Sequence, residues 1–426
     1  MVKPIKKLNN YYCFKQIEWN KLYPFFIAYF WGQTPNCLNR FKSMKLAIQR
    51  VVVIIMFCVL ATSTLKAQTD SINIVGTAVP FLRISPDARA GGMGDLAIAT
   101  TPDANAPFWN LAKLPFVAKK SSISINYTPW LKDLGLTDVY LASMAAYTKL
   151  DEESAISTSL RFFSLGNIQL TDNSGNILNS VKPSEFCIDL GYSRKLNNKL
   201  GIGGALRYIN SRLVTGDVGT GVVYKAGNSV AADVSVFYNG VSDDIATGIN
   251  WGVTLSNLGS KIGYTNDATN KDFIPANLGL GVAYVNDINQ SNRISFGLDL
   301  NKLLVPIAPK ATGSYSTDSA NLATYRNTGV VSSWLKSFND GTSVTSSFQA
   351  SLGMEYSYND QFFFRGGYFY EDKTRGNRKY FSVGAGFNMS SLSLNVSYLV
   401  PSGTGVTRNP LSNTVRFGLV FNLGDD

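Results

Sequence analysis

Residues 344–358 read VTSSFQASLGMEYSY, and apolar and polar side chains alternate along them. Counting from Val344, every second residue is apolar or aromatic except Ser346, and the residues between them are Thr, Ser, Gln, Gly and Glu. Successive side chains of a β-strand point to opposite faces, so this period of two residues predicts a strand with one apolar and one polar face.

The same alternation recurs from residue 121 to the end of the chain, most clearly in 294–301, 392–398 and 415–423. Each of these segments pairs an apolar face with a polar one, as a strand does when only one of its faces meets an apolar environment. Fourteen such strands are predicted, at residues 121–130, 138–149, 153–166, 184–195, 199–212, 229–239, 248–258, 276–286, 292–303, 344–358, 361–371, 379–389, 391–400 and 413–424.

The connections between these strands alternate in length, and the longest covers residues 304–343. An even number of strands with short turns on one rim and long loops on the other is typical of outer-membrane barrels. A soluble β-sandwich or propeller also alternates, but the predicted strands of about 10–14 residues exceed the roughly 5–6 that are usual in globular proteins. We therefore predict an all-β fold, a 14-stranded antiparallel transmembrane β-barrel with extracellular long loops.

The charge of this 426-residue chain is concentrated at its N-terminal end. The net charge is +10, and residues 1–67 hold ten Lys and Arg against one acid, so the remaining 359 residues carry 29 basic and 28 acidic side chains. This balance argues against a nucleic-acid partner, because such binding depends on an excess of cationic side chains. Histidine is absent and Cys187 is the only cysteine beyond residue 67, so histidine-based nucleophiles, histidine metal sites and internal disulfides of the body are excluded. We predict no metal and no cofactor.

Residues 44–67, MKLAIQRVVVIIMFCVLATSTLKA, have the order of a signal peptide. Lys45 and Arg50 precede an uncharged stretch of 15 residues, which is shorter than the roughly 20 that a spanning helix needs, and Ala67 is a small residue before Gln68. We predict export to the outer membrane through cleavage of this segment, and interpret residues 1–43 as an upstream extension from a mis-assigned start codon. An N-terminal membrane anchor is the alternative.

A resemblance to a known family begins before the first predicted strand. Residues 75–114 contain AVPFLRISPDARAGGMGD and TPDANAPFWN, and YTPW comes after them at 127–130. These segments, with SLRFFSLGNIQLTDNSGN at 159–176 and SEFCIDLGYSRKL at 184–196, resemble the PorV (LptO) family of type IX secretion system outer-membrane barrels. More widely, ARAGGMGDLAIAT resembles the FadL-type barrels, although Leu111 stands where their Asn-Pro-Ala motif has proline.

The resemblance implies a small N-terminal plug or hatch at residues 68–120, ahead of a barrel at 121–426. It also implies a carrier without catalysis, which binds the C-terminal signal domains of cargo at a giant translocon barrel. Such a carrier passes cargo to an attachment complex with a PorU-like sortase, at an outer membrane rich in lipopolysaccharide. Two alternatives stay open: a FadL-like transporter of hydrophobic small molecules, and a protein linked to lipid A deacylation. The chain has no histidine and no Gly-x-Ser-x-Gly elbow, so no catalytic residue is predicted.

Charged residues of the plug are expected to meet charged residues that face the lumen. The lumen charges form either a proton or ion path or, as we favour, a network of ion pairs that holds the plug. The run RAGGMGD at 89–95 lacks the context of a phosphate loop, and its glycines are expected to allow tight backbone turns inside the barrel. The predicted plug–barrel contacts are Arg83, Asp87, Arg89, Gly91, Gly92, Gly94, Asp95, Arg161 and Asp233.

Two apolar segments of the long loops are candidates for binding partners, because loops on a rigid scaffold carry much of protein recognition and exposed aromatic patches favour protein contacts. Trp130 and Leu131 open the first long loop. In the longest loop, one face of a short helix is predicted, and local packing over the barrel mouth is the alternative role. The residues of this face are Val330, Val331, Trp334, Leu335 and Phe338.

The signal peptide yields a first prediction: the mature protein begins near Gln68 after initiation at Met44. N-terminal sequencing of protein extracted from the membrane measures this directly. Residues 1–43 in the mature chain would contradict the assignment.

Overall fold

The computed structural model describes residues 75–424, apart from 133–134, 172–173, 218–220, 242–246, 268, 341–342, 401–410 and 412. The chain divides into two compact units, Met1–Asp70 and Ser71–Asp426, and every described residue belongs to the second. The predicted extension at 1–43 and signal peptide at 44–67 lie outside the described residues. No described helix is long and apolar enough to cross a membrane.

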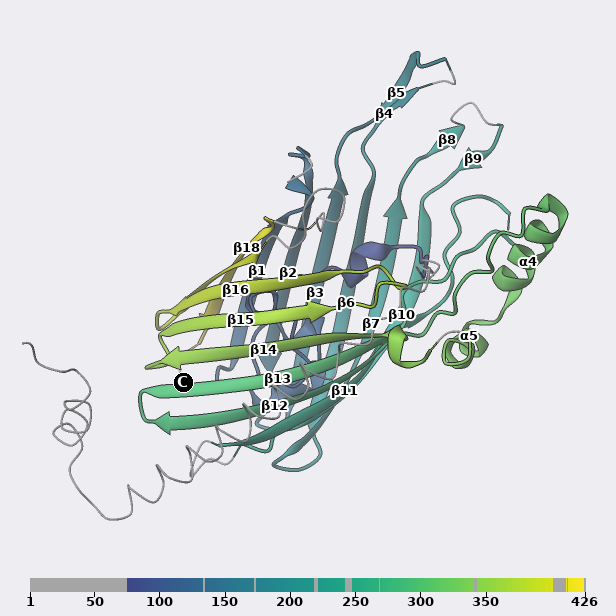
Figure 1. Ribbon diagram of the computed structural model, residues 1–426. Coiled ribbons are helices and arrows are strands. Elements are labelled where there is room, and N and C mark those ends of the chain that lie inside the picture. The colour runs from purple at the N-terminus through teal and green to yellow at the C-terminus, as the bar shows by residue number, and fades with distance from the viewer. Residues whose placement is uncertain are drawn as a thin grey trace, which may run out of the picture. The chain divides into compact units, whose positions relative to one another are not determined.

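Fourteen antiparallel strands of the described residues close into a barrel, which confirms the predicted fold class (Figure 1). Each strand pairs with its neighbours in the order of the sequence, and the first pairs with the last. The strands are β1 (Ser121–Pro129), β2 (Val139–Lys149), β3 (Ser154–Leu165), β6 (Ser184–Lys195), β7 (Leu200–Arg212), β10 (Gly227–Tyr238), β11 (Gly248–Gly259), β12 (Asn277–Asn289), β13 (Asn292–Leu303), β14 (Phe348–Tyr358), β15 (Phe362–Tyr370), β16 (Lys379–Asn388), β17 (Leu392–Val400) and β18 (Val415–Leu423).

The two faces of the barrel wall carry opposite kinds of side chain. On β1, Ile125 and Tyr127 point outward and are 45% and 44% exposed, whereas Ser124 and Asn126 point inward and are 0% and 3% exposed. An apolar exterior around a polar interior is the reverse of a soluble fold, and it fits a wall surrounded by lipid.

The beginning of β14 differs from the sequence prediction. The strand starts at Phe348, and Thr345–Ser347 instead form the 3₁₀ turn η6. Ser346 donates a hydrogen bond from Oγ to the carbonyl of Ser343, and Ser347 donates to that of Val344. Such local side-chain bonds offer the backbone an alternative to a strand ladder, which explains why the hydroxyl-rich residues before Phe348 leave the strand.

The long loops contain elements that the alternation did not reveal. Two small hairpins rise between β3 and β6 and between β7 and β10, beyond the end of the barrel that we call the long-loop rim, and two helices between β13 and β14 lie at that rim (Figure 1). These elements are β4 (Ile168–Thr171), β5 (Ile177–Val181), β8 (Gly216–Asp217), β9 (Val223–Tyr224), α4 (Tyr315–Asn327) and α5 (Val330–Lys336).

Residues 75–120, which we call the plug, fold as short helical turns inside the barrel (Figure 1). The turns are η2 (Pro80–Arg83), α3 (Ala88–Gly91), η3 (Ala106–Phe108) and η4 (Leu111–Phe116). Phe81, Met93 and Leu114 are almost completely buried, so the apolar core of the molecule lies where the plug meets the wall.

The closed barrel predicts a heat-modifiable protein. A closed barrel leaves no strand edge, so detergent cannot compete for its backbone hydrogen bonds and the folded form persists until the sample is boiled. Unheated and boiled samples are expected to migrate differently in a detergent gel, and circular dichroism is expected to be β-rich. A single band position, together with a helix-rich spectrum, would exclude this fold.

Candidate functional site

The plug approaches the wall so closely that glycine is required on both sides. A Cβ atom placed on Gly92 would lie 3.0 Å from the Cα of Gly384 in β16. A Cβ on Gly367 in β15 would lie 2.0 Å from the carbonyl carbon of Met93, and Gly94 adopts a φ of 69°. Gly94 thus has the backbone conformation of a tight turn, Gly92 allows a close approach, and the wall supplies matching glycines that sequence reasoning missed.

These wall glycines form a belt around the plug. A side chain at any of them would bring its Cβ within 3.0 Å of a plug atom, closer than non-bonded carbon atoms pack. The belt spans eight strands, so plug and wall fit each other around most of the lumen. Its members are Gly191, Gly201, Gly203, Gly252, Gly279, Gly281, Gly297, Gly353, Gly367 and Gly384.

Ion pairs join the plug to the wall at two places, and the first lies toward the end with short turns. Arg89 of α3 and Arg365 of β15 both bind the carboxylate of Glu355, at 2.8 and 2.6 Å. On another side of the plug, Asp95 lies 3.2 Å from Arg416 and accepts a hydrogen bond of 2.5 Å from the hydroxyl of Tyr380. Removal of one partner from such a buried pair leaves an uncompensated charge, so these contacts resist displacement of the plug.

Asp299 of β13 holds the plug backbone directly. One oxygen of its carboxylate accepts hydrogen bonds from the backbone N–H groups of Ala97 and Ile98, at 2.7 and 2.8 Å. The ammonium of Lys113 donates to the carbonyl of Ala97 at 2.9 Å and to Thr100 at 3.0 Å. The alternation marks Asp299 as facing the lumen, but a bond to backbone amides leaves no sign in the sequence.

Two more of the predicted plug contacts, Arg83 and Arg161, do connect the plug to the rest of the barrel. Arg83 lies 3.3 Å from Glu371, which also binds Arg378 at 2.7 Å, in the loop after β15. Arg161 of β3 reaches the plug by donating to the carbonyls of Leu82 and Phe108, at 3.2 and 3.4 Å.

Asp87 and Asp233 make different contacts from those expected. Asp87 accepts from the N–H of Ala90 and the indole of Trp109, so its carboxylate caps α3 within the plug. Asp233 pairs with Arg207 at 2.8 Å and accepts from the N–H of Asn257, all within the wall. Asn257 has a φ of 57° at a bulge between β10 and β11, so Asp233 stabilises an irregularity of the wall.

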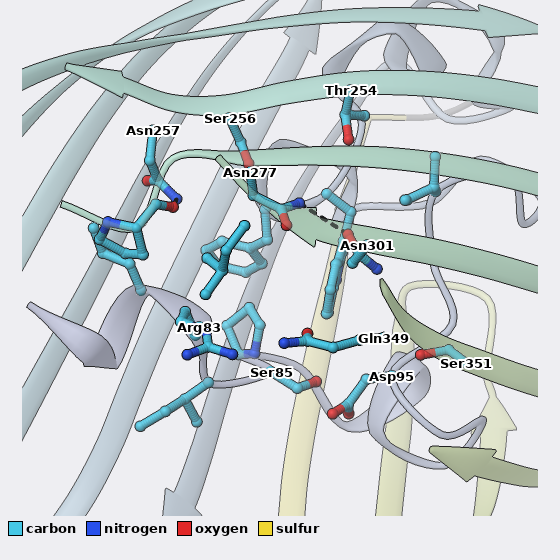
Figure 2. A pocket seen from close by; sticks show the side chains of 18 of the residues that line it. Arg83, Ser85, Asp95, Thr254, Ser256, Asn257, Asn277, Asn301, Gln349 and Ser351 are labelled. Carbon is cyan, nitrogen blue, oxygen red and sulfur yellow. Dashed lines mark hydrogen bonds between the residues drawn. The ribbon is translucent and has the colours of Figure 1, made fainter. Parts of the chain in front are cut away.

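The described residues enclose two sizeable cavities inside the barrel. The first, of about 110 Å³, lies between the plug and the wall on the side of the long-loop rim, and Figure 2 shows its polar lining. The second, of about 350 Å³, lies toward the short turns and is lined by Arg89, Glu355, Arg365 and several Asn and Ser side chains. Among the described residues, no group of three or more Cys, Asp and Glu side chains is arranged to hold a metal ion.

Trp130 and Leu131, which the sequence offers as binding residues, are half-buried. Both pack against a cluster at the long-loop rim that includes Phe369, Tyr380 and Leu399. Part of the surface of both side chains is therefore used in local packing at this rim, and their role in binding stays a prediction.

Helix α5 lies on the outer flank of the barrel. Along β13, Phe296, Leu298 and Lys302 share the outward face, yet Lys302 is buried beneath the residues that come after α5. Its ammonium donates to the carbonyl of Ser337 at 2.9 Å and lies 4.7 Å from the centre of the Phe338 ring. The C-terminal end of α5 therefore covers the outside of the wall at the long-loop rim.

The apolar residues of α5 turn away from the barrel. Ser333 and Ser337 face the protein, while Val331 and Leu335 are 63% and 74% exposed and Phe338 is also exposed. Val330 and Trp334 are half-buried beside them. Of the predicted face of five apolar residues, Val331 and Leu335 are thus the most open, and Phe338 is exposed on one side while its ring covers Lys302.

The C-terminal end of helix α4 packs against the loop that follows β11. The ammonium of Lys261 donates to the carbonyl of Thr328 at 2.6 Å, where the dipole of α4 favours positive charge. Tyr325 packs edge-on against Phe273 and donates to the carbonyl of Pro306, and burial raises its pKa to about 12. No residue of α4 is fully buried, so this helix projects from the rim with most of its surface open.

Comparison with known proteins gives one family match and several similar structures. The family described as type IX secretion system protein PorV matches residues 66–310. The Ralstonia pickettii toluene transporter TbuX is 9% identical with a TM-score of 0.47, and the match covers 79% of this chain and 97% of that one. The Pseudomonas putida toluene transporter TodX is 13% identical with a TM-score of 0.45, covering 83% and 98%. A Pseudomonas aeruginosa FadL homologue is 12% identical with a TM-score of 0.42, covering 83% and 100%. No curated protein matches the chain.

The glycine belt generates a prediction with a control in the adjacent residue. Gly367→Ala places a methyl group against Met93, whereas Gly366→Ala points outward, where Met354 is 3.9 Å away. Overpacking costs about 1–3 kcal/mol, so Gly367→Ala is expected to lower the unfolding temperature and to loosen the plug. Thermal unfolding and ion conductance in planar bilayers measure these effects. Equal behaviour of the two variants would show that the plug does not press on the wall.

Proposed function

The chain belongs to the PorV family of type IX secretion system proteins, and we propose that within this system it is a carrier that captures the C-terminal signal domains of cargo at the translocon. Family membership makes it an outer-membrane component of the secretion system. In the proposal, the carrier then delivers its cargo to an attachment complex with a PorU-like sortase. The observation that carries the proposal is an exposed apolar helix on the outer flank of a barrel whose lumen is filled.

The filled lumen directs attention to the rim. The plug is bonded to Glu355, Asp299 and Arg416 of the wall, and glycines of eight strands lie against it. A folded cargo domain has no room in cavities of about 110 and 350 Å³. Cargo binding is therefore assigned to the outside of the molecule, and the rim with long loops offers the larger surface.

The place of α5 suits a partner that is itself embedded in the membrane. Because Lys302 continues the outward face of Phe296 and Leu298, the helix lies beside the lipid-facing wall and not over the barrel mouth. A neighbouring barrel that docks alongside would meet Val331, Leu335 and Phe338 first. We assign this surface to the translocon, and the projecting helix α4 and the loop hairpins to cargo.

A transporter of hydrophobic molecules finds less support in the lumen. The first cavity is lined mainly by Ser, Thr, Asn, Gln and charged side chains. An apolar solute there would strip water from these groups without replacing their hydrogen bonds, which costs free energy.

The proposal predicts the result of changing α5. Val331→Ser combined with Leu335→Ser removes two exposed apolar side chains without touching the core. If they are contact hot spots, binding of the translocon weakens by about 1–4 kcal/mol. Pull-down of the translocon from solubilised membrane, together with the amount of cargo left in the periplasm, measures the effect.

Two controls make this experiment decisive. Leu322→Ser on α4 removes an exposed apolar side chain of similar size and is expected to leave the translocon bound. Arg161→Ala in the lumen is expected to weaken the plug without stopping secretion. A deletion strain that secretes its cargo normally but fails to take up a hydrophobic nutrient would refute the carrier function in favour of transport.

A further inference from the structure

The cavity of about 110 Å³ has one wall made of uncharged hydrogen-bonding groups. Four consecutive strands, β11 to β14, supply this wall, and Figure 2 shows their side chains facing plug residues Arg83, Ser85 and Asp95. Asn277 and Asn301 are bonded to each other at 2.9 Å, which holds their amides in place across β12 and β13. The members of this amide and hydroxyl wall are Thr254, Ser256, Asn277, Asn301, Gln349 and Ser351.

All but one of the charged side chains around the cavity have a partner of opposite charge among the described residues. Arg207 lies between Asp189 and Asp233, at 2.6 and 2.8 Å. Glu371 binds both Arg83 and Arg378. Arg161 is the exception, because among the described residues it is held by the carbonyls of Leu82 and Phe108 and not by a carboxylate. Apart from this guanidinium, the acids and bases around the cavity compensate each other.

Hydrogen-bonding capacity nevertheless remains open. The hydroxyl of Ser85 and the Nε of Arg161 are buried, and neither has a hydrogen-bond partner among the described residues. The pair of Asn277 and Asn301 uses one amide hydrogen and one carbonyl oxygen, so each amide retains further donors and acceptors. Buried polar groups are satisfied in nearly all proteins, so water or a polar ligand is expected to bind these groups.

The volume of the cavity limits the size of a ligand that binds there. One water molecule needs roughly 10–15 Å³ of cavity volume, so this cavity accommodates on the order of eight water-sized groups. Trp109 and Phe369 also line it and offer ring faces. We propose that the cavity binds a small uncharged polyhydroxylated molecule of monosaccharide size, either free or as the terminal sugar of a glycan. This site is independent of the carrier function proposed for the rim.

The proposal rests on matching chemistry. Hydroxyl groups both donate and accept, so a ring that carries several of them meets amides, serines and the open groups of Ser85 and Arg161 together. A carboxylate or phosphate ligand would instead compete with Asp233 and Glu371 for Arg83, Arg207 and Arg378, and only Arg161 would be free of a carboxylate partner. An apolar ligand would leave the remaining donors and acceptors of the amide and hydroxyl wall unsatisfied.

Saturation-transfer NMR on the full protein in detergent tests the site, with D-glucose, D-mannose and D-galactose as probes and toluene as the apolar comparison. We expect transfer to at least one sugar and none to toluene. Asn301→Leu is expected to raise the dissociation constant for that sugar roughly tenfold or more, because it removes an amide that bonds the sugar. Gln169→Ala, on the exposed hairpin β4–β5, is the control and leaves binding unchanged.

A second variant guards against misfolding. Ser256→Ala removes one hydroxyl of the wall with little change in volume, and heat-modifiable migration verifies that each variant is folded. Tighter binding of a disaccharide than of its component sugar assigns the site to a glycan end, and equal or weaker binding assigns it to a free sugar. Absence of transfer to every sugar, or transfer that persists equally in Asn301→Leu and Ser256→Ala, overturns the proposal and leaves a cavity that holds water only.

Discussion

The pairing of β1 with β18, from Ser121 opposite Leu423 to Tyr127 opposite Phe417, closes the wall on itself. In a bilayer no water is available to bond an open strand edge, so every N–H and C=O of the wall must find a partner within it. Closure forces the alternation of apolar outward and polar inward side chains and creates a lumen lined by serine, asparagine and charge. The plug occupies most of this lumen, and its polar groups meet those of the wall.

The plug and the wall are complementary both in shape and in charge. Glycines of eight strands allow the backbone of residues 91–98 and 110–112 to lie against the strands, and side chains there would force them apart. Ion pairs at Glu355 and Arg416, and the amide bonds to Asp299, then fix the position of the plug. Because this interior is rigid and occupied, the surfaces left for recognition are the rims, which explains why the long-loop rim carries α4, α5 and the extra hairpins.

The strands could be predicted because a half-buried strand repeats every two residues and the lipid-facing side must be apolar throughout. Exceptions have local causes, such as the serines at 346 and 347 that bond their own backbone and delay β14. Helix α4 was missed because YSTDSANLATYRN has no apolar stripe, which fits its lack of buried residues. In the lumen, the alternation identified charged side chains but not their partners: Asp87 caps a helix and Asp299 binds amides, and neither choice depends on sequence spacing. The wall glycines look like ordinary strand residues until the plug is in place.

The central claim is that the plug is a fixed part of the folded barrel, so that recognition takes place on the rim. Hydrogen–deuterium exchange of the intact protein tests it most directly at the amides of Ala97 and Ile98, which donate to Asp299. The account predicts that these amides exchange as slowly as those of β13 and far more slowly than those of the exposed helix α4. Exchange at the rate of α4 would show that the plug leaves the wall readily, and it would contradict the account.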